Sequence, residues 1–436
     1  MTTANTSRLA QAKSLISRGR QSGWAMAEYF AYPLMMFIVT PLFLYLLGTV
    51  QYGQWMLLLT FNGLGGLAGL GMGTAAIKEV SAFRGRSDLI GAAGAVRSCL
   101  GITLASSIAL SALLIILGLS AGSALLAKMG DPVVIRNIVI AAAFLIALEQ
   151  IDTVFAGAIR GMERFDVSAR IEASAKLVMV VAALLAAWMT HDLAAVIWVT
   201  VAITIIRALA KAIVAARVLQ TGPLWPRWEA TSVRSAFAFG KWTWIQSIGS
   251  AMFATADRML VGSLMGSTAL AHYSICLQLA QQIQTVPAAG AQVLFPIISR
   301  RSEQKQSVRK VAFQSMAVLM LFAGLIALPI IIFSHQILTL WVGHVIADEA
   351  GTVLSWLALG FALLAINNVP HFVLLGLNKA RSVAWCNMAA GVLAVGVSYM
   401  LIPTIGLQGA AWGRLGYAIV ISLLIALMSR ALRQSS

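Results

Sequence analysis

The chain has 436 residues, of which 60% are hydrophobic and only 11% are charged. A soluble protein of this length needs a far larger charged surface, so the composition excludes a soluble fold and predicts an all-α polytopic membrane protein. Cys99, Cys276 and Cys386 lie singly in apolar stretches, without a CxxC pair or a neighbouring histidine. We therefore expect neither disulfide bonds nor a metal site, and no cofactor is indicated.

Twelve transmembrane helices are predicted from apolar runs of about 20 residues, the length that crosses the hydrocarbon core of a bilayer. They begin near Gly23, Tyr52, Leu89, Asn137, Val167 and Asp192 in the first half, and near Phe237, Thr268, Val311, Thr352, Ser382 and Leu407 in the second. Residues 1–22 form a polar, basic arm without the apolar core of a removable signal peptide. We therefore expect the first span to be retained.

Basic residues gather at every second connection between these spans. They fall in 78–86, 160–170, 217–234 and 300–310, whereas the intervening connections carry almost no Lys or Arg. By the positive-inside rule, the basic connections and both termini are cytoplasmic. Topology thus accounts for most of the net charge of +16, and we expect no nucleic acid as a partner. The longest polar connection, 220–234, leaves no room for a soluble catalytic or nucleotide-binding domain.

A sequence pattern near the start of the chain recurs near its middle. Gly48 is followed by Tyr52 as Gly266 is followed by Tyr273, and later pairs of segments share nearly the same offset. An even number of spans in each half gives both halves the same orientation. Transporters built from such parallel repeats bind their substrate at the interface between the halves.

The repeat predicts the organisation of the whole chain. We expect a cytoplasmic arm at 1–22, an N-terminal six-helix lobe at 23–219 and a C-terminal six-helix lobe at 220–436. The second lobe is expected to begin with a cytoplasmic linker at 220–236, and a central cavity is expected between the lobes.

Several cations lie inside the predicted spans, where ionisable side chains are costly and mark function. The predicted cationic cavity, which would bind an anionic head group through its phosphates, consists of Arg97, Arg207, Lys211, Lys241, Arg258 and Arg414. The alternative for the arginines is a structural ion pair, in which the carboxylate of Glu149 or Asp152 neutralises Arg97 or Arg207. For Lys211 and Lys241 the alternative is that each extends to the lipid headgroups.

Acidic and amide side chains in the spans are the second group of candidates. Gln278 and Gln282 either hydrogen-bond sugar hydroxyls in the cavity or link helices to one another. The candidates for coupling to a proton or sodium ion are Glu28, Glu149, Asp152 and Asp257. The histidines are scattered and neither HExxH nor GxSxG occurs, so the sequence favours a transporter over an enzyme.

Glycines and prolines shape the predicted helices. Gly65, Gly69 and Gly73 recur at intervals of four, which favours close helix packing. Pro33 and Pro41 interrupt the first span and indicate either a static kink or a bend that moves during transport.

The chain resembles the bacterial polysaccharide flippases of the multidrug, oligosaccharidyl-lipid and polysaccharide exporter superfamily. The likeness lies in YLLGTVQYGQW, NGLGGLAGLGMGTAAIKEVS, AGAIRGMERF, ADRMLVGSLMGSTALAHYS and Pro296. It implies two six-helix lobes around a cavity that opens alternately to the two sides of the bacterial cytoplasmic (inner) membrane. The implied substrate is an undecaprenyl-pyrophosphate-linked oligosaccharide for lipopolysaccharide, capsule or exopolysaccharide. Asp257 matches an acidic position that is common at this point of the family.

The resemblance also implies partners and leaves alternatives. A polysaccharide polymerase and a chain-length regulator are the implied protein partners. The drug-exporting branch of the superfamily has the same number of helices, so an ion-coupled multidrug or cation antiporter stays the alternative function. A membrane-embedded polymerase or ligase for the same glycans is a third reading, disfavoured by the lack of a large extracytoplasmic loop.

Overall fold

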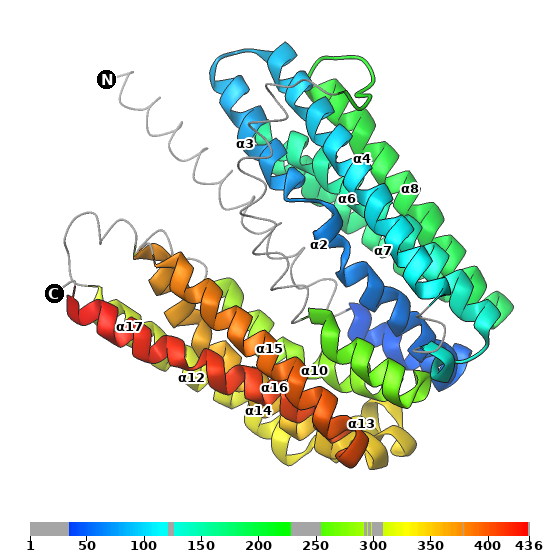
Figure 1. Ribbon diagram of the computed structural model, residues 1–436, viewed down its shortest axis with the longest axis vertical. Helices are drawn as coiled ribbons and strands as arrows, with labels where there is room; N and C mark the ends of the chain where they lie inside the picture. Colours follow the sequence, from blue (N-terminus) through cyan, green and yellow to red (C-terminus); the bar gives the residue numbers. More distant parts are fainter. Residues whose placement is uncertain are drawn as a thin grey trace, which may run out of the picture. The chain divides into compact units, whose positions relative to one another are not determined.

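The computed structural model describes residues 35–120, 126–227, 254–291, 294, 298, 308–377 and 379–434. Within these ranges every regular element is a helix, as Figure 1 shows, and no strand is present. The predicted all-α polytopic class is confirmed. Backbone amides and carbonyls in hydrocarbon must bond within their own segment, which is why an apolar chain of this kind folds into helices.

The first half of the sequence forms a series of long helices. Residues 35–63 are helical, with a left-handed residue at Gly48. The elements that follow are α2 (Gly65–Ala68), α3 (Met72–Gly85), α4 (Leu89–Leu119), the 3-10 turn η1 (Ala127–Met129), α6 (Pro132–Gly161), α7 (Phe165–Thr190) and α8 (Leu193–Val218).

The second half of the sequence is likewise helical within the described residues. Residues 254–265 are helical. The elements that follow are α10 (Ser267–Ala291), α12 (Arg309–Ile332), α13 (Ser334–Val342), α14 (His344–Gly376), α15 (Ala380–Ile405), α16 (Leu407–Ile421) and α17 (Leu423–Gln434).

Most of the predicted spans correspond to these helices. Two starts were wrong: α14 begins at His344 and not near Thr352, and Tyr52 lies inside the helix over residues 35–63. Among the described residues, nine helices are long and apolar enough to cross a membrane. The predicted starts at Leu89 and Leu407 are those of α4 and α16, and α8 follows directly on Asp192. The number twelve stays a prediction, because most of the first predicted span and the start of the seventh lie outside the described residues.

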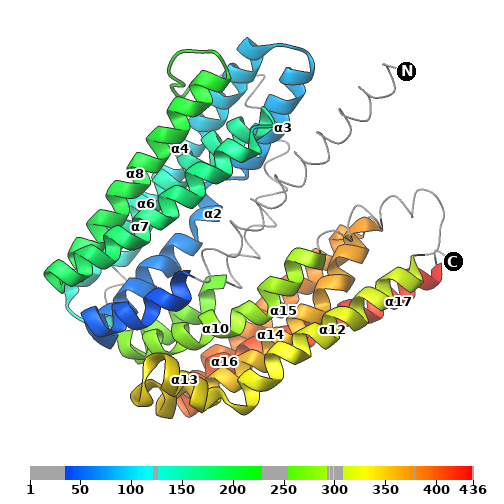
Figure 2. The same ribbon diagram turned by 180° about the vertical axis from the view of Figure 1, so that it is seen from behind.

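Short connections join consecutive helices by identifiable caps. His191 ends α7 in the left-handed region with φ 50°, and its amide donates to Ala187 O. Asp192 then caps α8, because its carboxylate accepts the Ala194 amide at 3.0 Å. This two-residue connection places α7 and α8 side by side, as Figure 2 shows.

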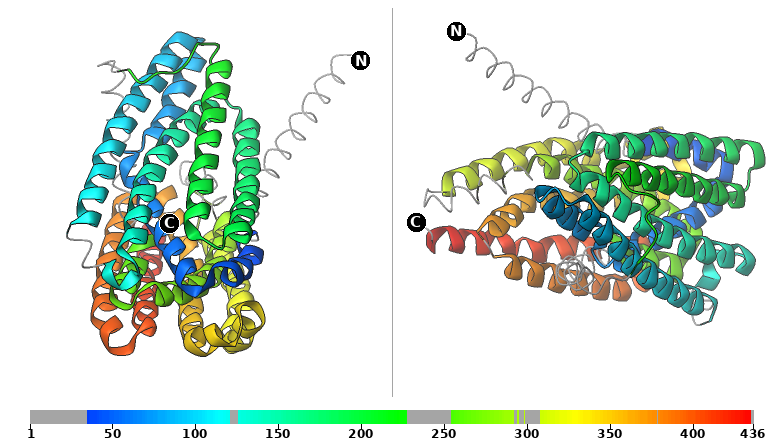
Figure 3. Two further views of the ribbon diagram at one scale, coloured as in Figure 1. Left: turned by 90° about the vertical axis from the view of Figure 1, so that its right-hand side faces the viewer. Right: turned by 90° about the horizontal axis from the view of Figure 1, so that it is seen from above.

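The chain divides into two compact units, which are described separately. The first unit contains the described residues of Met1–Leu46, Leu64–Leu117 and Val139–Ser247. Its core includes buried residues of α3, α4 and α6, among them Met72 and Val96. The packed pair α7 and α8 belongs to this unit and is visible in both views of Figure 3.

The second unit contains the described residues of Leu47–Gly63, Gly118–Ile138 and Ile248–Ser436. In it, α10, α12, α13 and α16 all pack on the central helix α14, and α15 packs on α16. Two of its segments therefore come from the first half of the sequence. The lobes predicted to meet at residue 220 stay a prediction.

Small residues let α2 and α3 approach α6 closely within the first unit. A Cβ at Gly65 would lie 3.0 Å from the Gln150 amide nitrogen, and one at Gly73 would lie 3.2 Å from Thr153 O. At Gly157 the backbone of α6 meets that of α3. These contacts fit the packing interpretation of the glycine stripe.

Candidate functional site

The first unit contains a buried group of four charged side chains, which we call the four-charge cluster: Asp152, Glu172, Arg207 and Lys211. Lys211 Nζ lies 2.7 Å from Asp152 Oδ2 and 2.6 Å from Glu172 Oε2. Arg207 Nε lies 3.4 Å from Asp152 Oδ2, and its Nη1 lies 3.5 Å from Glu172 Oε1. Each cation therefore contacts both carboxylates, and the charges balance.

The helices that carry the four-charge cluster explain its geometry. Arg207 and Lys211 are four residues apart on α8, so they point from the same face. α6 contributes Asp152 and α7 contributes Glu172. The Lys211 side chain is only 2% exposed, and a buried ammonium is tolerated only when it is paired. Lys211 thus does not extend to the lipid headgroups.

Two more ionisable residues surround the four-charge cluster. Glu149 lies three residues before Asp152 on α6 and interacts electrostatically with Arg207. Lys176 Nζ lies 3.4 Å from Glu172 Oε1, one turn further along α7. The Asp152–Arg207 pair was one alternative raised by the sequence. Glu172 was missed, although the same rule, an ionisable residue inside a predicted span, identifies it.

The second unit contains a different buried group, the Asp257 cluster: Asp257, Arg258, Tyr273 and Arg414. Arg414 Nε and Tyr273 Oη both donate to Asp257 Oδ2, the latter at 2.5 Å. The other carboxylate oxygen accepts the Arg258 amide at 2.8 Å. Arg414 also lies 5.4 Å from the centroid of the Phe361 ring, within range of a cation–π contact.

Arg258 gives the Asp257 cluster an excess of positive charge, unlike the four-charge cluster. Its side chain interacts electrostatically with Asp257 and Arg414, and with Tyr273 and Tyr52. Its Nε has no hydrogen-bond partner among the residues that the structure describes. The cluster holds two guanidinium groups and one carboxylate, and Arg414 already occupies that carboxylate.

A small pocket lies beside the Asp257–Arg414 pair. Its other walls are Ala256 and four residues of α15: Gly391, Ala394, Val395 and Ser398. These small side chains leave the space, which is large enough for about one water molecule. The ion pair thus borders a small cavity and is otherwise buried.

The remaining predicted site residues are not brought together. Arg97 Nη2 donates to Thr221 Oγ1 at 3.3 Å, and Thr221 belongs to neither cluster. Gln282 Nε2 donates to Gln278 O at 3.1 Å within α10, so this amide bonds to its own helix. Lys241 and Glu28 lie outside the described residues.

Comparison with known proteins gives the family. The family model described as "Polysaccharide biosynthesis protein" matches residues 95–348, which is more than half of the chain. The chain belongs to this family. The resemblance stated from the sequence motifs is thereby confirmed.

A curated relative from Shigella flexneri, named "Putative O-antigen transporter", is 29% identical over 179 residues. The match covers 40% of this chain and 42% of the relative.

Solved structures share the fold over nearly the whole chain. One match is a multidrug resistance MATE family transporter of the MOP superfamily, solved in an inward-facing conformation. Its TM-score is 0.72 and its sequence identity 14%, and the match covers 94% of this chain and 98% of the other. A MOP superfamily transporter from Pyrococcus furiosus, whose binding pocket is described as having reversed polarity, matches with a TM-score of 0.57 and 13% identity, covering 93% and 96%. At these identities the likeness shows the fold alone.

Proposed function

We propose that this protein is a transporter of the bacterial inner membrane that moves a lipid-linked oligosaccharide across the bilayer by alternating access. The undecaprenyl-pyrophosphate-linked repeat unit of a surface polysaccharide is the proposed substrate. Membership of the polysaccharide biosynthesis family supports this proposal, as does the relative named as an O-antigen transporter. A polymerase and a chain-length regulator are the proposed protein partners, and both termini are proposed to be cytoplasmic.

The observation that carries the proposal is the uneven charge of the Asp257 cluster. Burying half of a guanidinium group in a membrane protein without a paired carboxylate costs free energy, unless a bound anion neutralises its charge. Arg258 is such a group, and Arg414 lies close enough to interact with it electrostatically. A pyrophosphate carries several acceptor oxygens, which guanidinium groups bind in bidentate fashion.

The same charge balance disfavours the alternative function. A cation or drug antiporter needs a site with an excess of negative charge or of aromatic faces. In the Asp257 cluster the single carboxylate is already bound to Arg414 and Tyr273. A cationic substrate would have to displace a buried guanidinium from it.

The four-charge cluster is proposed to have a structural role in the first unit. Its two cations are matched by two carboxylates, so it presents no net charge to a substrate. Glu149, beside it, is the proposed residue for coupling to a proton or sodium ion, because no ion pair to its carboxylate is found within the described residues. Asp257 is a weaker candidate for that role, since Arg414 holds it.

The proposal is tested by replacing Arg258 in the source strain deleted for the gene. Arg258→Ala is expected to abolish surface polysaccharide, and Arg258→Lys to restore only part of it, because an ammonium binds phosphate as a point charge. Arg309→Ala, at the exposed start of α12, is the matched control and is expected to have no effect. Normal polysaccharide in the Arg258→Ala strain, or protection of an efflux-deficient host from dyes, would count against the proposal.

A further inference from the structure

The first unit carries a small group of uncharged polar side chains, which we call the amide–hydroxyl face: Thr74 on α3, and Gln150 and Thr153 on α6. Both threonines are exposed, and the Gln150 side chain is half-buried. α6 has 30 residues, so it is about 45 Å long, whereas the hydrocarbon core is about 30 Å thick. Thr153 lies about 12 Å before the end of α6 and therefore within the hydrocarbon core.

Glycines bring the three side chains of the amide–hydroxyl face to one place. A Cβ at Gly69 would overlap the Gln150 amide, so this side chain lies directly over the glycine. A Cβ at Gly73 would lie 3.2 Å from Thr153 Oγ1, and Thr74 is the next residue of α3. The face is thus continuous from α6 to α3.

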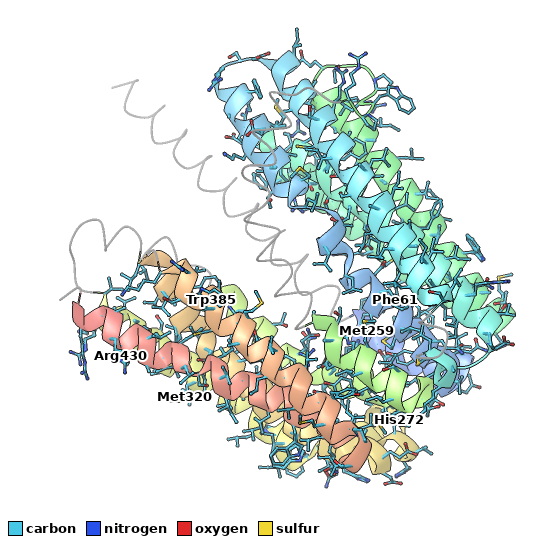
Figure 4. All side chains as sticks on the ribbon, viewed as in Figure 1. Phe61, Met259, His272, Met320, Trp385 and Arg430 are labelled. Carbon is cyan, nitrogen blue, oxygen red and sulfur yellow. The ribbon has the colours of Figure 1, made fainter. Side chains whose placement is uncertain are left out.

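The amide–hydroxyl face is not the side of α6 that contacts lipid. Ile140 and Phe144 are 38% and 59% exposed, as expected of apolar side chains against acyl chains, and Figure 4 shows side chains projecting outward along the helices of this unit. Phe144 lies nine residues before Thr153, which at 100° per residue places the two on opposite sides of α6. Exposed polar side chains within a span, on the side away from lipid, border water.

The hydrogen-bonding capacity of the amide–hydroxyl face suits a sugar. Thr74 Oγ1 donates to Gly71 O and Thr153 Oγ1 donates to Gln150 O, each at 2.7 Å. Each hydroxyl thus directs its proton to its own helix and presents its oxygen as an acceptor, while the Gln150 amide both donates and accepts. Sugar hydroxyls need such partners wherever they leave water. An uncharged group of this kind favours hydroxyls over a phosphate.

We propose that the amide–hydroxyl face binds the sugar portion of the lipid-linked substrate. Thr74 and Thr153 accept hydrogen bonds from sugar hydroxyls, and Gln150 donates and accepts. This inference rests on the proposed function, in which Arg258 binds the pyrophosphate, and it gives the uncharged part of the same molecule a separate site. The face distinguishes glycans by the positions of their hydroxyls, and a prenyl pyrophosphate without sugar gains no affinity from it.

The proposal is tested by replacing Thr74 and Thr153 together with valine, which has nearly the same shape but no hydroxyl. Native mass spectrometry measures the affinity of purified protein for two lipids. One is the undecaprenyl-pyrophosphate-linked repeat unit extracted from the source strain deleted for the gene, and the other is undecaprenyl pyrophosphate. The matched control is Thr404→Val on α15, because Thr404 is also exposed and its Oγ1 also donates to a carbonyl three residues earlier, Leu401 O, at 2.9 Å.

The wild type and Thr404→Val are expected to bind the repeat-unit lipid more tightly than undecaprenyl pyrophosphate. The double valine variant is expected to bind undecaprenyl pyrophosphate as the wild type does. Its affinity for the repeat-unit lipid should fall roughly tenfold, the effect of about two hydrogen bonds. Thr74→Ser with Thr153→Ser, which keeps both hydroxyls, should bind both lipids as the wild type does.

Two results for the double valine variant would overturn the proposal. One is wild-type affinity for the repeat-unit lipid, and the other is an equal loss for both lipids, which would indicate a role in helix packing alone. If the wild type binds both lipids equally, the sugar site fails and the proposed function stands. If the wild type binds neither lipid, the proposed function itself fails.

Discussion

The two charge clusters differ in how they are completed. In the four-charge cluster, two cations and two carboxylates satisfy one another from three neighbouring helices. In the Asp257 cluster, one carboxylate serves Arg414 and leaves Arg258 without an acidic partner of its own among the described residues. We propose that the balanced cluster holds helices together, whereas the unbalanced one binds an anion. We infer that buried charges in this membrane protein either join helices or bind a ligand, and that the ratio of cations to carboxylates distinguishes the two roles.

The largest effect is expected from Asp257→Ala, because it leaves the buried guanidinium of Arg414 and the half-buried one of Arg258 with no carboxylate. Breaking a buried pair in this way costs roughly 3–5 kcal/mol. The free energy of unfolding, measured by SDS titration in mixed micelles, should fall by about that amount. The double variant Asp257→Ala with Arg414→Met should recover much of the lost unfolding free energy, since it also removes the Arg414 guanidinium that Asp257→Ala leaves unpaired. Equal losses in the single and double variants would show that the pair does not act as a unit.

A smaller effect is expected from Lys211→Met in the four-charge cluster. Arg207 remains within 3.5 Å of both carboxylates and partly compensates them, so the loss should be nearer 2 kcal/mol, the value of one or two hydrogen bonds to charged groups. The same SDS titration measures it. A loss as large as that of Asp257→Ala would mean that the two clusters are not balanced in the way described. Polysaccharide export, normalised to folded protein, should be unchanged.

The smallest effect is expected from Glu163→Gln, which removes an exposed ion pair. Arg84 Nη1 lies 2.8 Å from Glu163 Oε2, but the Glu163 side chain is 73% exposed. Water screens such a pair, so the change in unfolding free energy should stay below about 1 kcal/mol. This variant is the reference for the two buried clusters. A loss of unfolding free energy as large as that of Lys211→Met would show that burial does not explain the larger losses expected there.

The sequence predicted the helices well and the clusters only in part. Apolar runs located the starts of α4, α8 and α16, because span length is dictated by the thickness of the bilayer. Arg207 and Lys211 were recognisable as one face of a helix, and Asp152 as an acidic partner. The pairing of Asp257 with Arg414, 157 residues apart, was not predicted, because helical spacing relates residues only within one helix.

The contacts between the two copies of the sequence pattern were also not predicted from the sequence. The repeat identified Gly48 with Gly266 and Tyr52 with Tyr273, but similarity between two segments does not show that they meet. Nothing in the sequence predicted a contact of Lys128 with the second half of the chain. The structure adds that its ammonium group ends on Leu264 O, in the other half of the chain.

The most direct test of the central claim measures the binding of undecaprenyl pyrophosphate to purified protein by native mass spectrometry. Undecaprenol is the phosphate-free control. The wild-type protein and Arg309→Ala are expected to bind the pyrophosphate and not the alcohol, and Arg258→Ala to lose at least about tenfold in affinity, or 1.4 kcal/mol. Equal binding of the pyrophosphate by Arg258→Ala and the wild type, or equal binding of the alcohol and the pyrophosphate, would contradict the account.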